Sequence, residues 1–457
     1  MRPLAAELSL VAHALPERVT GVVSALRGPL LLVDELPLPA GALVSVLPAR
    51  APRARIPGEV VGFASGQTMV MLLAQGPGIA AGDRVRAEQA AQTALVSDRM
   101  LGRCINALGE PIDALGPIRA RVPMPLDPDP IAPLARGLIR EALPTGVRAI
   151  DLFATLGRGQ RMGIFAGPGV GKSSLLGQIA RADGADANVI ALIGERGREV
   201  REFIERSLGP AGLARSAVVI ATGDESPLMR VRAAKLACSI AEHLRDQGRG
   251  VMLMMDSITR FAHALRQIGL AVGEPPATKG YTPSVFAGLA LLLERAGAVE
   301  RADGRAGSIT GLYTVLVEGD DLTGDPVSDA ARGILDGHIV LSRRLAQAAH
   351  FPAIDVLDSV SRVADEVSEP AHVAARRQLV RLLAKHREIA ELVQIGAYTR
   401  GASAESDVAL DIEPDLRALL QQGREEREPL AQARARMVAL AVRAGDALAK
   451  KSRPRAA

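Results

Sequence analysis

The sequence contains no tryptophan, and aromatic residues occupy only 2% of its 457 positions. Its core must therefore be aliphatic, and the 48% hydrophobic content is ordinary for a globular protein that buries a sizeable core. Two cysteines, Cys104 and Cys238, lie far apart and lack the spacing of a metal site. No zinc site or disulfide framework can be predicted from them, which fits a reducing compartment.

Long hydrophobic runs are also missing. The longest, from Val285 to Leu293, ends at Glu294 and has about half the length that spans a bilayer. Near the N-terminus, Glu7, Ser9 and His13 interrupt any signal-peptide core. We therefore expect a soluble, cytoplasmic protein.

The formal charge of +4 is unevenly distributed. Residues 434–457 hold seven Lys or Arg against the single acid Asp446, so this tail carries +6 and the remaining chain about −2. A basic tail is usually solvated, and contact with an anionic membrane surface is the less favoured alternative. Basic residues are not interleaved with aromatic ones, so we predict no nucleic-acid partner.

The first eighteen residues predict a short amphipathic helix, because Leu4, Leu8, Val11 and Leu15 recur at helical spacing. This helix could pack on its own domain or dock on a partner or neighbouring subunit. From residue 19 to residue 92, short apolar runs alternate with turn residues, which predicts a small β-barrel of five or six strands.

A proline-rich segment, Ala120–Gly137, excludes a continuous helix or a central strand. After Gly146, apolar strands alternate with helical segments, which is typical of a parallel α/β domain, and we assign residues 93–369 to it. The expected strands are Met162–Ala166, Val189–Ile193, Ala217–Ala221, Val251–Met255, Gly311–Val317 and Ile339–Leu341. Residues 370–457 predict a helical domain with the basic tail, and its expected helices are Val373–Ile395, Pro414–Gln422 and Leu430–Leu448.

The strongest motif is AGPGVGKSS, between the strand MGIFA and the helical LLGQIARA. Its glycines let backbone N–H groups surround a phosphate, while Lys172 reaches the β- and γ-phosphates and the Ser173 hydroxyl ligates Mg²⁺. The strict pattern has glycine at position 166, where this chain has alanine, but that position closes the strand. The alternative is a glycine-rich turn with a chance lysine. The expected ATP-binding residues of the motif are Ala166, Gly167, Pro168, Gly169, Val170, Gly171, Lys172, Ser173 and Ser174.

Two further strand ends carry acids. Asp256 ends VMLMMD, where a carboxylate could hold hydrated Mg²⁺ beside the loop, although many buried strands end in Asp. Glu195, in GERGREVREF, could polarise the water that attacks the γ-phosphate. The alternative for this second motif is a charged loop paired internally as Glu195–Arg198 or Arg196–Glu199.

In this order, the motifs resemble the rotary-type ATPase superfamily, which includes the F- and V-type catalytic subunits and the type III secretion ATPases. Three stretches are similar to those that members of this superfamily share: PAIDVLDSVS, LGRCINALGEPID and LPTGVRAIDLF. The resemblance covers nearly the whole chain. FAGPGVGKSSLL, GEPPATKGYTPSVFA and ILDGHIVLSRRLA are most similar to the flagellar export branch, with injectisome ATPases close to it. The resemblance implies a RecA-like P-loop domain between the barrel and the helices.

The resemblance also implies residue roles. Lys172 and Ser173 serve phosphate and Mg²⁺, Glu195 orients water, and Asp256 is the metal-side acid, acting through water. Arg196 resembles a γ-phosphate sensor. These roles make Lys172, Glu195 and Arg196 catalytic candidates.

Three more positions follow from the resemblance. Arg260 resembles a structural partner of the carboxylates. Phe351 matches the position where an aromatic ring packs on adenine, with Phe in place of the Tyr common in F-type subunits. Arg362, in SVSRV, is the catalytic candidate for an arginine supplied to a neighbouring subunit, and the alternative is a salt bridge with Asp358 or Asp365.

The leading hypothesis is a Mg²⁺-dependent ATPase that energises protein export through a flagellar-type apparatus. Alternatives are the ATPase of a virulence injectisome and the catalytic subunit of a rotary ATP synthase. Retention of Lys172 and Glu195 argues against a non-catalytic ring subunit. An RNA helicase of similar core is disfavoured because Phe63 is the only aromatic residue before Phe153.

The expected partners are identical subunits in a homohexameric ring, a regulatory stator-like protein at the N-terminal helix, the export gate, and export substrates with their chaperones. The expected location is the cytoplasm, with peripheral association at the inner-membrane export apparatus.

Overall fold

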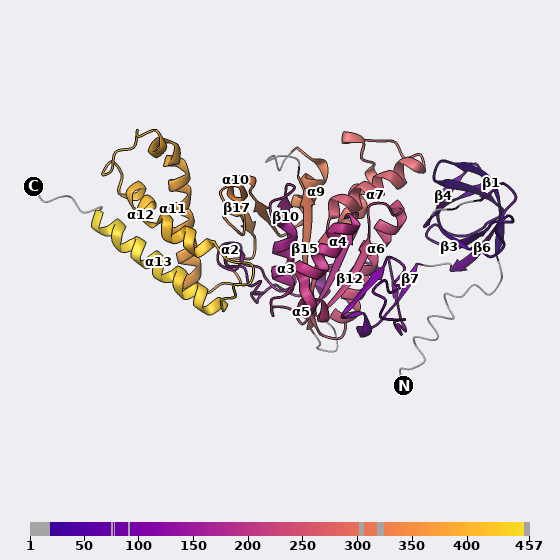
Figure 1. The fold of residues 1–457 in the computed structure, drawn as a ribbon, viewed down its shortest axis with the longest axis horizontal. Coiled ribbons are helices and arrows are strands. Elements are labelled where there is room, and N and C mark those ends of the chain that lie inside the picture. Colours follow the sequence, from indigo (N-terminus) through magenta and orange to yellow (C-terminus); the bar gives the residue numbers. More distant parts are fainter. Residues whose placement is uncertain are drawn as a thin grey trace, which may run out of the picture.

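The computed structural model describes residues 19–74, 76, 78–89, 92–300, 306–317 and 324–451. A β-barrel and a bundle of helices lie at opposite ends of the molecule, with a parallel sheet and its covering helices between them (Figure 1). The fold class predicted from the sequence is therefore confirmed. The amphipathic helix expected over residues 1–18 lies outside the described residues.

The barrel closes in the order β1-β2-β5-β4-β3-β6. It therefore has six strands, where the sequence predicted five or six. Inward-facing valines and leucines fill its centre, among them Leu31, Val33 and Val70, which are fully buried. Closure pairs every strand on both sides and leaves no open sheet edge. The strands are β1 (Thr20–Arg27), β2 (Leu30–Asp34), β3 (Leu43–Leu47), β4 (Ile56–Ala64), β5 (Gln67–Leu72) and β6 (Arg84–Gln89).

A two-stranded ribbon follows the barrel, where β7 (Thr93–Val96) pairs with β9 (Val122–Pro125). The proline-rich segment therefore contributes only a short, two-stranded pairing and the 3₁₀ turn η2 (Pro133–Ala135), as its prolines require. A second 3₁₀ turn, η1 (Asp98–Met100), precedes the central sheet.

The central sheet has the order β17-β16-β10-β15-β13-β11-β12-β8, with β14 paired to β15. All six predicted strands are present, and they pair in parallel. The near-continuous runs of Val, Ile, Leu and Ala are explained by burial on both faces. The strands are β8 (Arg103–Asn106), β10 (Arg161–Ala166), β11 (Ala187–Ile193), β12 (Ser216–Ala221), β13 (Gly250–Asp256), β14 (Gly297–Glu300), β15 (Ala306–Leu316), β16 (Gly337–Leu341) and β17 (Ile354–Ser361).

Helices cover this sheet on both sides (Figure 1). The longest, α6, packs along β11, β12 and β13. One segment is unusual, because the π-helix η3 (Phe203–Leu208) continues α4 directly and packs on α3. The covering elements are α2 (Arg148–Phe153), α3 (Lys172–Ala180), α4 (Gly197–Glu202), α5 (Gly209–Ala214), α6 (Pro227–Arg245), α7 (Ile258–Ala271), η4 (Thr278–Gly280), α8 (Pro283–Leu293), α9 (Pro326–Ile334) and α10 (Arg343–Gln347).

The C-terminal bundle consists of α11 (Pro370–Gln394), α12 (Ala404–Leu420) and α13 (Leu430–Lys451). The second of these helices begins ten residues before the predicted start at Pro414, which lies inside it. Ser403 caps the true start through the N–H of Ser406, and Val408 and Ile412 are buried against the bundle. This packing offsets the backbone hydrogen bond that proline cannot make.

No helix in the described ranges is long and apolar enough to cross a bilayer.

Candidate active site

The loop 167–171 leaves the carboxyl end of β10 and leads into α3, which begins at Lys172. Gly169 and Gly171 have φ of 78° and 94°, values that glycine adopts without strain and that turn successive N–H groups toward a common point. Ala166 is the last residue of β10 and is fully buried, so its methyl group belongs to the strand. Alanine at this position therefore leaves the loop free to surround a phosphate.

This loop opens into a cavity of about 1140 Å³. The predicted residues that line it are Ala166, Gly167, Pro168, Gly169, Gly171, Lys172, Ser173, Ser174, Glu195 and Arg196. Val170 instead points into the core and anchors the loop there. Phe351 is half-exposed and lies beside the loop, where a Cβ on Gly171 would be 3.9 Å from its ring.

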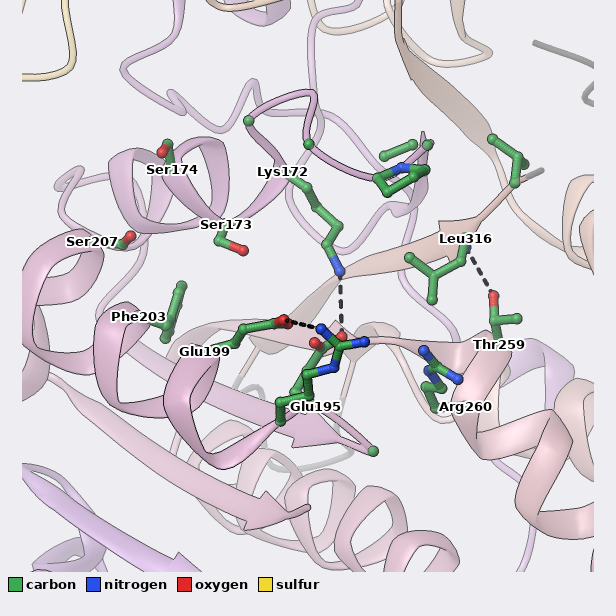
Figure 2. Close-up of a pocket in the computed structure, with 18 of the residues that line it drawn as sticks. Lys172, Ser173, Ser174, Glu195, Glu199, Phe203, Ser207, Thr259, Arg260 and Leu316 are labelled. Carbon is green, nitrogen blue, oxygen red and sulfur yellow. Dashed lines mark hydrogen bonds and ion pairs between the residues drawn. The ribbon is translucent and has the colours of Figure 1, made fainter. Parts of the chain in front are cut away.

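The Lys172 ammonium lies between two acids, Glu195 and Asp256, and Figure 2 shows it pointing toward Glu195. It forms an ion pair with Asp256 and lies 3.5 Å from Oε1 of Glu195. Asp256 ends β13 and is almost fully buried, and Thr314 Oγ1 donates to its Oδ1 at 2.7 Å. Lys172 is thus paired with both carboxylates. A phosphate that enters the loop would compete with Glu195 and Asp256 for the Lys172 ammonium.

Glu195 follows β11 and the positive-φ Gly194, so it stands at the carboxyl end of the sheet beside the loop. Burial raises the pKa of Glu195 to about 7; Lys172 opposes this effect and the negative charge of Asp256 adds to it. A carboxyl with such a pKa is suited to accept a proton near neutral pH.

Arg196 is paired with Glu199 at 3.6 Å, and 87% of its side chain is exposed. This ion pair is one of the two internal pairs weighed from the sequence; the other, Glu195–Arg198, is not formed, because Glu195 pairs with Lys172. Arg196 nevertheless lines the cavity and needs only a rotamer change to leave Glu199.

Arg260 begins the exposed face of α7 and lines the cavity opposite the loop (Figure 2). The sequence suggested a structural partner of the carboxylates. Within the described part of the chain its guanidinium has no carboxylate within ion-pair distance, so that expectation is not met there. An exposed guanidinium on the wall of the cavity is suited to an anionic ligand.

Arg362 does not reach this cavity. It is exposed and follows β17, whose last residue pairs with the first residue of β16, Gly337. Neither salt bridge considered from the sequence forms: Asp358 pairs with Arg387, and Asp365 pairs with Arg376 and Arg377.

The donor set at the loop fits a hard divalent cation. Ser173 offers a hydroxyl in the first turn of α3, and Asp256 offers a carboxylate whose Oδ2 carries no hydrogen bond from the described residues. The described chain has no cluster of three or more His, Cys, Asp or Glu that could hold a metal by itself. Mg²⁺ is commonly held in such a way, by one or two protein oxygens together with substrate phosphates and water.

Sequence reasoning missed several residues in and beside the cavity. Thr314 does not line the cavity but donates to Asp256 beside it, and nothing in the strand sequence AGSITGLYTVL distinguishes it from Ser308 or Thr310. Others line the cavity and come from segments distant in the chain, including Arg181, Ser207, His263, Lys279, Tyr281, Arg424 and Glu425. No motif connects these positions, because only the fold brings them together.

Comparison with known proteins identifies the same elements. Residues 146–361 match the ATP synthase alpha/beta family nucleotide-binding domain, and residues 368–439 match the T3SS EscN ATPase C-terminal domain. The flagellum-specific ATP synthase of Pseudomonas aeruginosa is 48% identical over 84% of this chain and 85% of its own. The type 3 secretion system ATPase of Xanthomonas euvesicatoria is 50% identical over 80% of this chain and 81% of its own.

A solved structure agrees with these matches. EscN of enteropathogenic E. coli, assembled and in complex with its central stalk EscO, superimposes with a TM-score of 0.84 at 37% identity, over 92% of this chain and all of EscN. The fold and the loop define a P-loop nucleotide-binding protein. The chain belongs to the family of flagellum-specific ATP synthases and type 3 secretion system ATPases, and it is an ATPase.

Proposed function

We propose that this chain hydrolyses MgATP in a ring of identical subunits and so energises protein export through a flagellar-type type III secretion apparatus. The observation that carries the proposal is the position of Lys172, between Glu195 and Asp256 at a phosphate-binding loop. The relatives named flagellum-specific ATP synthase, at 48% and 47% identity over 84% and 90% of the chain, support the flagellar assignment. The secretion-system relative at 50% identity supports the second candidate, the ATPase of a virulence injectisome.

The proposed chemistry follows from the positions of the side chains. Lys172 binds the β- and γ-phosphates once it leaves the carboxylates, and Glu195 accepts a hydrogen bond from the attacking water. Ser173 and, through water, Asp256 would hold Mg²⁺, which neutralises charge on the phosphates. Arg196 and an Arg362 from a neighbouring subunit stabilise the charge that develops on the γ-phosphate.

The adenine site is proposed at Phe351. Its ring lies beside Gly171 and is half-exposed, so it is accessible to a base. Stacking requires only a π face, which Phe provides as well as Tyr.

The ring is proposed as a homohexamer. Glu195 and Arg362 occur in the same chain at separate places, so identical copies arranged head to tail could complete one another's sites. The assembled state of the EscN relative supports this arrangement.

Further partners are proposed on the same basis. The EscN complex with its central stalk supports a stalk protein for this chain as well. The regulatory stator-like protein would bind residues 1–18, whose apolar stripe a short helix cannot bury alone. We also propose the export gate and the substrate–chaperone complexes as partners, and the cytoplasm at the inner membrane as the location, because the export function requires them.

The function is tested in a deletion strain. Loss of motility and of secreted flagellar subunits, restored by the intact gene but not by Lys172→Ala, would establish the export role. Normal motility together with lost secretion of injectisome effectors would favour the second candidate, which the Xanthomonas relative supports. Lost ATP synthesis in inverted membranes, with export intact, would indicate a rotary synthase subunit instead.

A further inference from the structure

The connection between α12 and α13, residues 421–429, is held by one buried arginine of the α/β domain. Arg148 lies in α2 and is only 4% exposed. Figure 1 shows that α2 lies against the C-terminal helices. The Arg148 guanidinium donates hydrogen bonds to two carbonyls and two carboxylates. The carbonyls are those of Leu419 (2.8 Å) and Gln421, and the carboxylates are those of Glu426 and Glu428 (3.1 Å).

Gln422 completes this attachment from the other side. Its side chain is buried, accepts from the N–H of Arg148 at 2.8 Å and donates to Gly146 O at 2.8 Å. Its own backbone N–H donates to Phe351 O at 2.9 Å. The 421–429 connection is therefore tied to Phe351, beside the phosphate-binding loop.

The same connection forms a wall of the cavity. Arg424 and Glu425 line it together with the loop residues. Arg181, just after α3, donates to Arg424 O at 3.0 Å and lies 3.4 Å from Glu425. The wall is thus attached to Arg181 after the end of α3 on one side and to Phe351 on the other.

A ligand whose phosphates occupy the loop must extend its nucleoside part toward Phe351 and this wall. Arg148 itself does not line the cavity, but it holds the wall that does, and a buried guanidinium keeps its position only when its donors are paired. Its planar fork reaches several acceptors at once, which a lysine ammonium at the same place does not. Loss of the fork would free the wall and leave the phosphate-binding loop intact.

We propose that Arg148 is a positioning residue that holds the 421–429 connection as the base-side wall of the cavity and thereby sets the affinity for the nucleoside part of the ligand. This inference rests on the proposed nucleotide-binding function.

The test compares ADP with inorganic tripolyphosphate, which has no nucleoside, by calorimetry on the full chain. In Arg148→Lys, ADP affinity should fall about tenfold, the factor that corresponds to about 1.4 kcal/mol, while tripolyphosphate affinity stays the same. The matched control is Arg376→Lys. Arg376 is also buried, and it joins α11 to the core through Thr155 without touching the connection.

Gln422→Met provides a second variant that leaves no buried charge unpaired, and it should show the same selective loss. Melting curves establish that each variant is folded. The inference would be overturned if Arg148→Lys and Gln422→Met bound ADP as tightly as the wild type, or if they lost affinity for ADP and tripolyphosphate in parallel. The proposed function would stand in either case. A wild-type protein that binds neither ligand would overturn the proposed function and this inference with it.

Discussion

Arg362 and Lys172 lie at opposite ends of the central sheet. Lys172 follows the carboxyl end of β10, whereas the N–H of Arg362 donates to Asp336 O at 3.0 Å, and the N–H of Asp336 donates to Arg161 O at the first residue of β10. The strand has six residues, so its two ends are separated by roughly 20 Å. Arg362 therefore cannot serve the phosphate-binding loop of its own chain.

The first prediction concerns this separation. Arg362→Ala should lower kcat by about a thousandfold, the effect typical of an arginine supplied in trans, while ADP affinity stays unchanged. Mixing it with Glu195→Gln should restore part of the turnover, because some interfaces then pair an intact Glu195 with an intact Arg362. Steady-state hydrolysis and calorimetry measure both quantities.

Arg377→Ala serves as the control, because it removes an exposed arginine of the same region that pairs with Asp365. It should hydrolyse ATP at the wild-type rate. No rescue in rings shown by mass spectrometry to be mixed, or full activity in a strict monomer, would contradict the in-trans role.

The second prediction is a pH dependence. The pKa of Glu195 is raised to about 7, chiefly by burial, so the carboxyl is protonated below that pH and cannot take up a proton. We expect kcat/KM, which reports the free enzyme, to rise about tenfold per pH unit below 7 and to level off above it. Stopped assays between pH 5.5 and 8.5, roughly the range around that pKa, would record the profile.

Glu195→Gln should bind nucleotide but turn over too slowly to show this slope. Lys172→Ala should lose hydrolysis at every pH, because no ammonium then neutralises the negative charge of the β- and γ-phosphates. A Glu195→Gln protein with the parental rate, or a flat wild-type profile across pH 7, would exclude Glu195 as the proton acceptor.

The elements predicted correctly have local signals. Strand β10, the glycine loop and α3 follow one another within about twenty residues, so composition and spacing predict them without tertiary information. The barrel strands likewise alternate between buried and exposed positions. Where the pattern and the packing agree, the sequence is sufficient.

The elements that were missed depend on distant contacts. Strand β17 has acids at Asp355 and Asp358, which are unusual in a sheet and are neutralised by Arg387 of α11. The contact between Thr314 and Asp256 joins residues on two neighbouring strands far apart in sequence. Neither pairing can be inferred from one sequence, because the strand order decides it.

The third prediction concerns Thr314. When Lys172 moves to a phosphate, Asp256 keeps Thr314 as its buried donor, so Thr314→Val should leave the carboxylate less well positioned. We expect a higher Mg²⁺ requirement for ADP binding and about 1–2 kcal/mol lower stability. Titration of ADP with and without Mg²⁺ measures the first, and denaturant unfolding measures the second.

Thr314→Ser should restore both properties, since it returns the hydroxyl. Thr310→Val is the matched control on the same strand: Thr310 is equally buried, but its hydroxyl accepts from Gly159 N at the other end of the sheet. Should Thr310→Val and Thr314→Val change the Mg²⁺ requirement equally, Thr314 would have no specific connection to Asp256.

The final prediction concerns the contact between α3 and the π-helix η3. Gly177 packs so closely that a Cβ would lie 2.4 Å from the backbone oxygen of Ser207. Gly177→Ala must therefore displace one helix from the other, at a cost of about 1–3 kcal/mol that exceeds the gain in helix propensity. Because α3 begins at Lys172, ADP affinity should fall together with stability.

Gly197→Ala is the control, since a Cβ there meets nothing within 4 Å and the residue opens α4 beside the same cavity. It should melt at or slightly above the wild-type temperature and bind ADP normally. If Gly177→Ala kept both its melting temperature and its ADP affinity, the close approach of α3 and η3 would have no part in holding the phosphate-binding loop. A loss of stability with normal ADP affinity would limit that contact to folding alone.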